Sequence, residues 1–145
     1  MTTTAEKKKS KKKAAIVPNA RGKRKEAIAR AVIVPGNGKV YINRMLASTM
    51  NDPQVREIIA EPMHFLADRD KVDIKVATNG GGSRGQAQAI RTAIAKAIVE
   101  YTKSDELHAE IIAYDRSMLV DDARRVEPKK FKGPKARARF TKSYR

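Results

Sequence analysis

The sequence predicts a single small α+β domain, with helices on one face of a small sheet, between two strongly basic ends. Two kinds of pattern support this class: short apolar runs that alternate with polar residues, and longer segments with apolar residues at helical spacing. A chain of 145 residues has room for one ordinary domain with extensions. We expect strands at 26–34, 39–43 and 72–76, and helices at 53–62, 83–101 and 106–112.

The first two strands are expected to form a hairpin. Residues 26–34 contain the β-branched run AIARAVIV, which stops at the turn sequence of residues 35–38, Pro-Gly-Asn-Gly. Beyond that turn, Val40 and Ile42 alternate with more polar neighbours, as in a strand that is buried on one face. The third strand shows the same alternation and ends at a run of glycines.

The helices are predicted from capping residues and from periodicity. Asn51 or Asp52 can cap a short helix that has Pro53 in its first turn, where a missing N–H does no harm, and that runs until Pro62. The long helix after the third strand follows the i, i+3, i+4, i+7 rule for apolar residues. A last core contact is expected at 118–120, before the basic tail begins.

Gly80, Gly82 and Gly85 match the pattern G-x-G-x-x-G between a predicted strand and a predicted helix. Dinucleotide binding would require a second parallel strand after the helix, and the sequence there is polar and then helix-like, which disfavours that interpretation. Two interpretations stay open. The glycines permit a tight turn and close packing, or the helix N-terminus, with Ser83 and Arg84, binds a phosphate.

Composition excludes several other functions. The chain has no cysteine, so disulfide frameworks, thiolate zinc sites and cysteine nucleophiles are ruled out, and a reducing compartment is expected. No apolar run resembles a signal peptide or a membrane span, so we expect an intracellular protein. His64 and His108 have no carboxylates at catalytic or metal-ligand spacing, and His64, beside Met63 and Phe65, is expected in the core or just below the surface. We therefore expect no enzymatic activity, no metal and no cofactor.

The net charge of +16 is concentrated at the two ends of the chain. Residues 1–25 and residues 124–145 each hold ten basic residues and one acidic residue, while residues 26–123 are nearly neutral. Segments of this composition cannot form a core of their own and usually become ordered on a polyanion. The domain organisation is therefore expected to be a disordered Lys-rich arm at 1–20, a core at 21–123 and an extended basic tail at 124–145.

The two basic ends differ in character. The lysines between positions 7 and 13 are as consistent with a solubilising tail or a nuclear address as with RNA binding, so their role stays open. The C-terminal segment instead interleaves Phe131, Phe140 and Tyr144 with arginines, whose planar groups bind phosphates and stack on bases. Asp121 and Asp122 precede this segment and are expected to pair with the arginines at 124 and 125.

Three blocks, GKRKEAIARAVIVPGNGKVYIN, NGGGSRGQAQAIRTAIAKAIVEY and DDARRVEPKKFKGPKARARFTKSYR, together resemble the universal small-subunit ribosomal protein S nine family over about residues 21–145. The closing KSYR is more similar to the archaeal and eukaryotic branch than to the bacterial one. The resemblance implies a four-stranded domain like the second domain of ribosomal protein S five, with a left-handed βαβ crossover. It also implies a structural protein in the head of the small subunit, located in the cytoplasm, whose tail reaches toward the peptidyl-site tRNA.

The partners implied are small-subunit ribosomal RNA, peptidyl-site tRNA and neighbouring proteins of the subunit head, without a membrane and without homo-oligomers. The tRNA contacts are expected at Lys142, Tyr144 and Arg145. The residues expected to bind ribosomal RNA are Arg21, Lys23, Arg24, Lys25, Arg84, Arg124, Arg125, Lys129, Lys130, Phe131, Lys132, Lys135, Arg137, Arg139 and Phe140. Two other functions stay open as alternatives. A free-standing RNA-binding or RNA-chaperone protein would share the composition and the basic ends, whereas a small nucleotide-dependent phosphotransferase would need an acid–base pair that the sequence does not offer.

Overall fold

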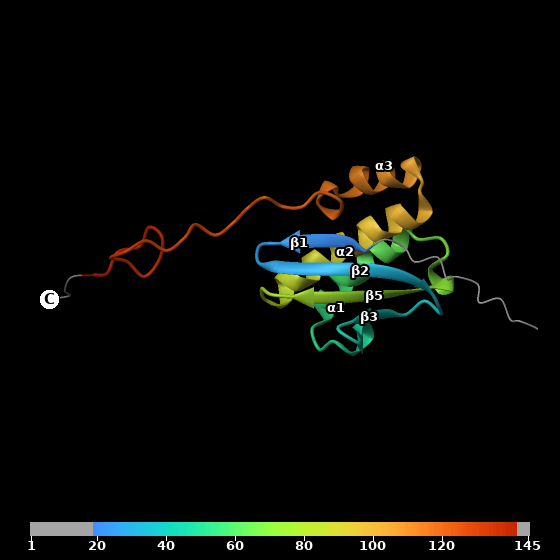
Figure 1. The fold of residues 1–145 in the computed structure, drawn as a ribbon, viewed down its shortest axis with the longest axis horizontal. Helices are drawn as coiled ribbons and strands as arrows, with labels where there is room; N and C mark the ends of the chain where they lie inside the picture. The colour runs from blue at the N-terminus through green and yellow to red at the C-terminus, as the bar shows by residue number, and fades with distance from the viewer. Residues whose placement is uncertain (1–18, 142–145) are drawn as a thin grey trace, which may run out of the picture.

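The computed structural model describes residues 19–141, and within them it forms one mixed sheet packed against helices (Figure 1). The Lys-rich segment at 7–13 and the last four residues lie outside the described residues. The strands are β1 (Ala20–Arg24), β2 (Ala27–Pro35), β3 (Val40–Ile42), β4 (Met45–Leu46) and β5 (Val72–Asn79). The helices are α1 (Pro53–Ala60), α2 (Ser83–Thr102) and α3 (Asp105–Tyr114), with short 3-10 turns between them. The predicted α+β class is confirmed.

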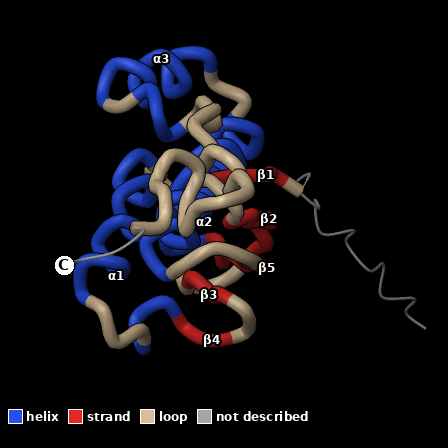
Figure 2. Tube along the Cα trace, turned by 90° about the vertical axis from the view of Figure 1, so that its left-hand side faces the viewer, coloured by secondary structure: helices blue, strands red, loops and turns tan. Residues whose placement is uncertain are grey.

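Helices α1 and α2 lie on one side of the strands, as Figure 2 shows, and the opposite face of the sheet is left open. Alternate residues of β2, among them Ala29, Ala31 and Ile33, are buried beneath α2, which contributes Ile90 and Ile94 to the same core. The intervening residues of β2 are partly or fully exposed. The sheet therefore has a buried inner face and an outer face that no helix of residues 19–141 covers.

Gly22 in β1 allows α2 to approach the sheet at close range. A Cβ atom at this position would lie 2.2 Å from the carbonyl oxygen of Ala89 and 2.5 Å from the amide nitrogen of Ala93. Because both atoms belong to the helix backbone, they cannot move aside for a side chain. This close contact makes β1 part of the folded domain.

The strand order corrects the predicted hairpin. The sheet runs β1-β2-β5-β3-β4, so β5 lies between the two strands that were expected to pair. β2 pairs with β5 in antiparallel fashion and β3 pairs with β5 in parallel fashion, with Ile74 opposite both Ile33 and Val40. Alternation identifies a strand with one buried face, but it carries no information about which strand is its neighbour.

The Pro-Gly-Asn-Gly segment is a turn, but its hydrogen bonds go to β5. The amides of Gly36 and Gly38 donate to the carbonyls of Lys71 and Val72, at 2.9 and 3.1 Å. The Asp73 carboxylate also accepts from the amides at positions 37 and 39, at 2.8 and 2.9 Å. These bonds lower the pKa of Asp73 below its usual range. The turn thus crosses the start of β5 and delivers β3 to the far side of that strand.

The structure also has five strands where four were expected. β1 was missed because Ala20–Arg24 lies inside the basic segment, where three cations obscure the buried positions at Ala20 and Gly22. Lys25, with φ of 53°, makes the tight turn from β1 to β2 without a glycine. β4 has only two residues, both exposed, so it has no apolar pattern to detect.

The predicted helices are confirmed. The Asp52 side chain accepts from the amide of Gln54 at 3.0 Å and caps α1, with Pro53 in the first turn. Ser104 caps α3 in the same way. Of the expected last core contact, Met118 is buried against Ile111, whereas Val120 is exposed.

Arg91 on α2 joins two of the connecting segments to the helix. Its guanidinium forms ion pairs with Glu61 and Asp115, each at 2.6 Å. Burial opposes ionisation of Asp115, but hydrogen bonds from the amide and hydroxyl of Ser117, and the pair with Arg91, outweigh it and lower the pKa of the carboxyl.

Within residues 19–141, no helix has the length and apolar character needed to cross a membrane.

Candidate nucleic-acid interface

The glycine segment between β5 and α2 lies directly against the β1–β2 turn. Gly80 and Gly81 have φ values of 75° and 66°, in the left-handed region that favours glycine. A Cβ on Gly80 would lie 2.5 Å from the carbonyl oxygen of Glu26, and one on Gly81 would lie 2.9 Å from the Ala27 side chain. At these two positions, the packing interpretation of the glycines is supported.

The other two glycines of the motif are not needed for packing. Gly82 has an ordinary φ of −104°, and an added Cβ would meet nothing within 4 Å. Gly85 would meet its neighbours only at ordinary contact distances. Gly82 is the N-cap of α2, and no side chain caps the helix. The amides of the first helical turn, beginning at Ser83, are therefore available to an anion.

Cations surround this helix terminus unevenly. Arg84 is exposed, and its guanidinium donates to Gln54 on α1 at 2.8 Å. Lys25 is exposed in the adjacent turn, and Lys23 is half-buried. Arg24 is already engaged, because it donates to Gln88 at 2.7 Å and forms an ion pair with Asp122. Among the expected RNA-binding residues in this region, Lys25 and Arg84 therefore present the most accessible charge.

The root of the tail is attached to the domain by two carboxylates. Asp122 pairs with Arg24 of β1 and with Arg124 at 2.7 Å, and Asp121 pairs with Lys96 of α2 at 2.8 Å. The expected pair with Arg124 is confirmed, and the links to β1 and α2 are additional. No ion pair of Arg125 is found among the described residues.

Beyond this root, the chain runs away from the domain without helix or strand and makes one loop before residue 141 (Figure 1). Glu127 accepts ion pairs from Lys130 and Arg137 at 3.0 and 2.9 Å, and Arg139 donates to the carbonyl of Phe131 at 3.2 Å. These contacts close the loop and leave its aromatic rings facing solvent.

The tail presents aromatic and cationic groups together. Phe131 is 79% exposed and Phe140 is 66% exposed, values that no folded core would produce. The Lys132 ammonium lies 5.8 Å from the centre of the Phe131 ring. The tail cations without a carboxylate partner among the described residues are Arg125, Lys129, Lys132, Lys135 and Arg139. The expected tRNA contacts Lys142, Tyr144 and Arg145 lie outside the described residues.

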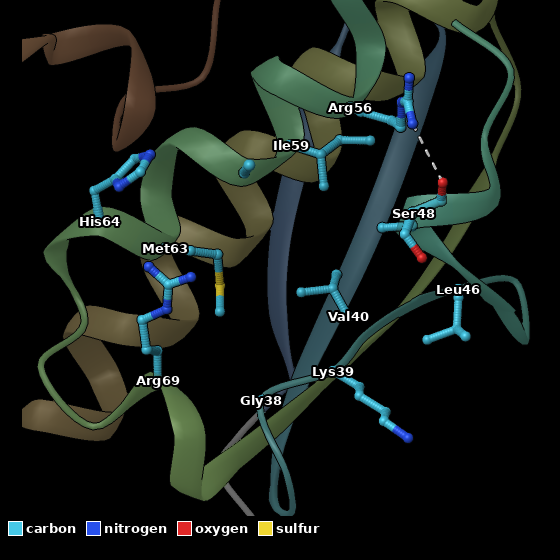
Figure 3. Close-up of a pocket in the computed structure, with 12 residues that line it drawn as sticks. Gly38, Lys39, Val40, Leu46, Ser48, Arg56, Ile59, Met63, His64 and Arg69 are labelled. Atoms are coloured by element: carbon cyan, nitrogen blue, oxygen red, sulfur yellow. Dashed lines mark hydrogen bonds between the residues drawn. The ribbon is translucent and has the colours of Figure 1, made fainter. Parts of the chain in front are cut away.

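A separate hollow of about 420 Å³ lies between β3 and α1 (Figure 3). Val40, Ile59 and Met63 are among its apolar lining residues, and Arg56 donates to the carbonyl of Ser48 at 3.5 Å at its edge. No carboxylate lines the hollow, so it offers no acid–base pair.

His64, which also lies at the edge of this hollow, is exposed, so the expected core or subsurface position is wrong. The 3-10 turn at this point buries Met63 and directs the histidine outward.

Sequence reasoning missed two cations on the open face of the sheet. Arg30 on β2 and Lys75 on β5 are exposed, on the side opposite α2. The signal was present in the alternation of both strands, because each cation stands at a position that the pattern assigns to the outer face.

Within the described residues, no cluster of three or more histidine, aspartate or glutamate side chains is placed to hold a metal ion.

Comparison with known proteins identifies relatives over most of the chain. Residues 22–145 match a family model described as ribosomal protein S9/S16. A protein of Picrophilus torridus is 55% identical over 125 residues, which cover 86% of this chain and 94% of the relative. One from Halobacterium salinarum is 43% identical over 132 residues, covering 90% of this chain and the whole of the relative. Both are named small ribosomal subunit protein uS9.

Proposed function

Because the chain belongs to the ribosomal protein S9/S16 family, we propose that it is a structural component of the small ribosomal subunit that binds ribosomal RNA in the subunit head. We further propose that its C-terminal tail extends toward the peptidyl-site tRNA. Proteins of this family are structural, so the chain is not an enzyme. A small-subunit protein is located on the ribosome, in the cytoplasm. Its other partners would be neighbouring proteins of the head, and the chain would form no homo-oligomer.

The tail carries the RNA-binding part of this proposal. It leaves the domain with two exposed phenylalanines and a series of cations, and Glu127 is its single acidic residue. Lysine and arginine release condensed counterions when they neutralise RNA phosphates, which supplies affinity that depends little on base sequence. Exposed aromatic rings add stacking on unpaired bases. A solubilising extension would gain nothing from the rings.

Specificity is proposed to come from the shape of the RNA. A folded RNA presents a unique arrangement of phosphates and 2′-hydroxyl groups, which a segment that folds on binding can follow. Ordering roughly 22 residues costs about 1 to 2 kcal/mol for each. Many contacts are therefore required, and the ion pairs at Asp121 and Asp122 reduce the cost by fixing where the tail begins.

The tip of the tail is the proposed tRNA-binding element, at Lys142, Tyr144 and Arg145. An extended segment from 124 to 145 spans at most roughly 70 Å, enough to cross a layer of RNA and reach a second ligand. The topology proposed with this function is that of the second domain of ribosomal protein S five, with a left-handed crossover from β3 to β5. The parallel pairing of β3 with β5, which α1 separates along the chain, supports a βαβ unit, and its left-handed crossover is part of the proposal.

Deletion of residues 142–145 tests the proposed role of the tip. We expect small subunits to assemble nearly normally and to bind tRNA at the peptidyl site more weakly by about 1 to 3 kcal/mol, the size of one or two charge-assisted contacts. Filter binding of tRNA to reconstituted subunits measures the change. If the deletion blocks assembly and spares tRNA binding in the subunits that form, the tip is an anchor in ribosomal RNA.

Sedimentation tests the ribosomal assignment itself. In a lysate at low salt, the protein is expected to travel with small subunits. A protein that remains at the top of the gradient would instead favour the free-standing RNA-binding or RNA-chaperone function.

A further inference from the structure

The open face of the sheet carries an unbalanced set of charges. Arg21 and Lys23 of β1, Arg30 of β2 and Lys75 of β5 all lie on this face, opposite α2. The one carboxylate on the same face of these strands is Asp73, and its oxygen already accepts from two amides of the turn before β3. Asp73 keeps its negative charge and lies near Lys75, so four cations against one carboxylate leave a net charge of +3 on this face of the three strands.

The register of the strands places like charges directly beside each other. Arg21 stands opposite Arg30 across the β1–β2 pair, and Lys75 stands opposite Val32, two residues further along β2. No side-chain ion pair of Arg21, Arg30 or Lys75 is found within residues 19–141. Like charges directly opposite each other destabilise a sheet. An anion that lies across this face would relieve the repulsion.

An aromatic residue and a hollow lie at the β3 side of the same face. Tyr41 is half-buried and stands opposite Lys75 in the β3–β5 register. Together with Asn43, Arg44, Asp73, Val76 and Ala77, these two residues line an open hollow of about 820 Å³, in which two cations stand against one carboxylate. A tyrosine beside a lysine and an arginine suits an unstacked base with its phosphate. An acidic protein segment would use the cations but would have no need of a ring beside an amide side chain.

We propose that the outer face of the sheet, at Arg21, Arg30, Lys75 and Tyr41, is a second RNA-binding surface, which contacts a strand of ribosomal RNA independently of the C-terminal tail. This inference rests on the proposed function, because it requires an RNA partner, and it extends that function to a face of the domain. The domain is then held by RNA on its sheet as well as through the tail. RNA binding also accounts for the outer face being free of helices among the described residues.

The first test compares full-length variants in binding to small-subunit ribosomal RNA at several salt concentrations. The double variant Arg30→Gln/Lys75→Gln removes two cations from the face. The matched control, Lys103→Gln/Arg116→Gln, removes two exposed cations beside α3. We expect the face variant to bind about tenfold or more weakly and to flatten the slope of log K against log salt by roughly 1.5 to 2 units. The control should change both quantities much less.

Equal losses in the face variant and the control would overturn the proposal, because the effect would then reflect total charge alone. Normal RNA binding by the face variant, with poor incorporation into subunits, would also overturn it and would assign the face to a protein neighbour. Circular dichroism checks that the face variant and the control variant are both folded.

The second test uses the absence of cysteine from the chain. A single cysteine at Ala77→Cys, on the outer face, or at Thr141→Cys, in the tail, carries a tethered Fe–EDTA group into reconstituted subunits. Cleavage of ribosomal RNA from both positions, at different nucleotides, is the expected result. Cleavage from the tail alone would overturn the sheet-face proposal and leave the proposed function intact. Cleavage from neither position, in subunits that contain the protein, would overturn both.

Discussion

The folded domain and the tail use the same kinds of residue in opposite ways. In the domain, apolar side chains such as Ile94 and Ile98 are fully buried, and Asp73, Asp115 and Arg91 are held by partners within the chain. In the described part of the tail, residues 124–141, the phenylalanines face solvent and five of the eight cations form no ion pair with a carboxylate. The difference indicates that the domain has enough contacts to fold alone, whereas the tail needs a partner to become fully ordered.

Deleting residues 124–145 should produce the largest change and should affect binding alone. If eight of the ten lost cations contact phosphate, the slope of log K against log salt changes by roughly 6 to 7 units. The domain should stay folded, because the described part of the deleted segment, residues 124–141, supplies no residue to either buried cluster. Urea unfolding and salt-dependent RNA binding of the same truncated protein provide the two measurements. Unfolding of the truncated domain would show that the two regions are not separable.

Substitutions in the glycine turn between β5 and α2 should change the free energy of unfolding and leave RNA binding unchanged. Gly81→Val places a branched side chain at a φ of 66° and against Ala27, and we expect a loss of about 2 to 3 kcal/mol in the free energy of unfolding. The sequence alone predicts the same outcome at Gly82, but the structure leaves that position open. Gly82→Val should therefore cost no more than about 1 kcal/mol, the size of a weakened cap.

Chemical denaturation of the two glycine variants in parallel makes the comparison. Equal losses at both positions would mean that chain entropy, rather than the contact with Ala27, determines the effect.

Substitution of Arg84 is expected to change RNA affinity rather than stability, as deletion of the tail does, although Arg84 lies in the domain. Arg84→Ala removes an exposed guanidinium beside the uncapped start of α2 and should weaken RNA binding by about tenfold, near 1.4 kcal/mol, with little change in stability. Fluorescence anisotropy with labelled ribosomal RNA measures the affinity. An unchanged affinity would leave packing as the whole explanation of the glycine motif.

The smallest expected effect concerns pH and Asp73. Its pKa is lowered by the turn amides, so its contribution to stability is present above the ordinary aspartate pKa and is lost as the pH falls through the lower, folded value. Asp73→Asn should therefore be less stable than the parent near neutral pH, and the two proteins should converge below about pH 4. Thermal unfolding between pH 2.5 and 7 measures this. A stability difference between the two proteins that stays the same at pH 2.5 would contradict the stabilising role of the ionised Asp73 carboxylate.

Local patterns predicted the helices well because their signals are local. The cap at Asp52, the proline after it and the periodicity of residues 83–102 each report on contacts within a few residues. The predicted pair between Asp122 and Arg124 succeeded for the same reason, since the two residues are neighbours in the chain. The links from Asp122 to Arg24 and from Asp121 to Lys96 join distant segments, and nothing in the local sequence indicated them.

The sequence by itself determined the α+β class, the helices, the near-neutral centre and the charged ends, because these depend on residue type and short-range spacing. Only the tertiary structure decided that β5 lies between β2 and β3, that Gly22 brings β1 against α2, and which cations share the outer face. Strand order and register are set by the packing of the whole core, so a one-dimensional pattern cannot specify them. For the same reason, the alternation of the strands marked Arg30 and Lys75 as outward-facing, but their place beside Arg21 and Tyr41 depended on which strands became neighbours.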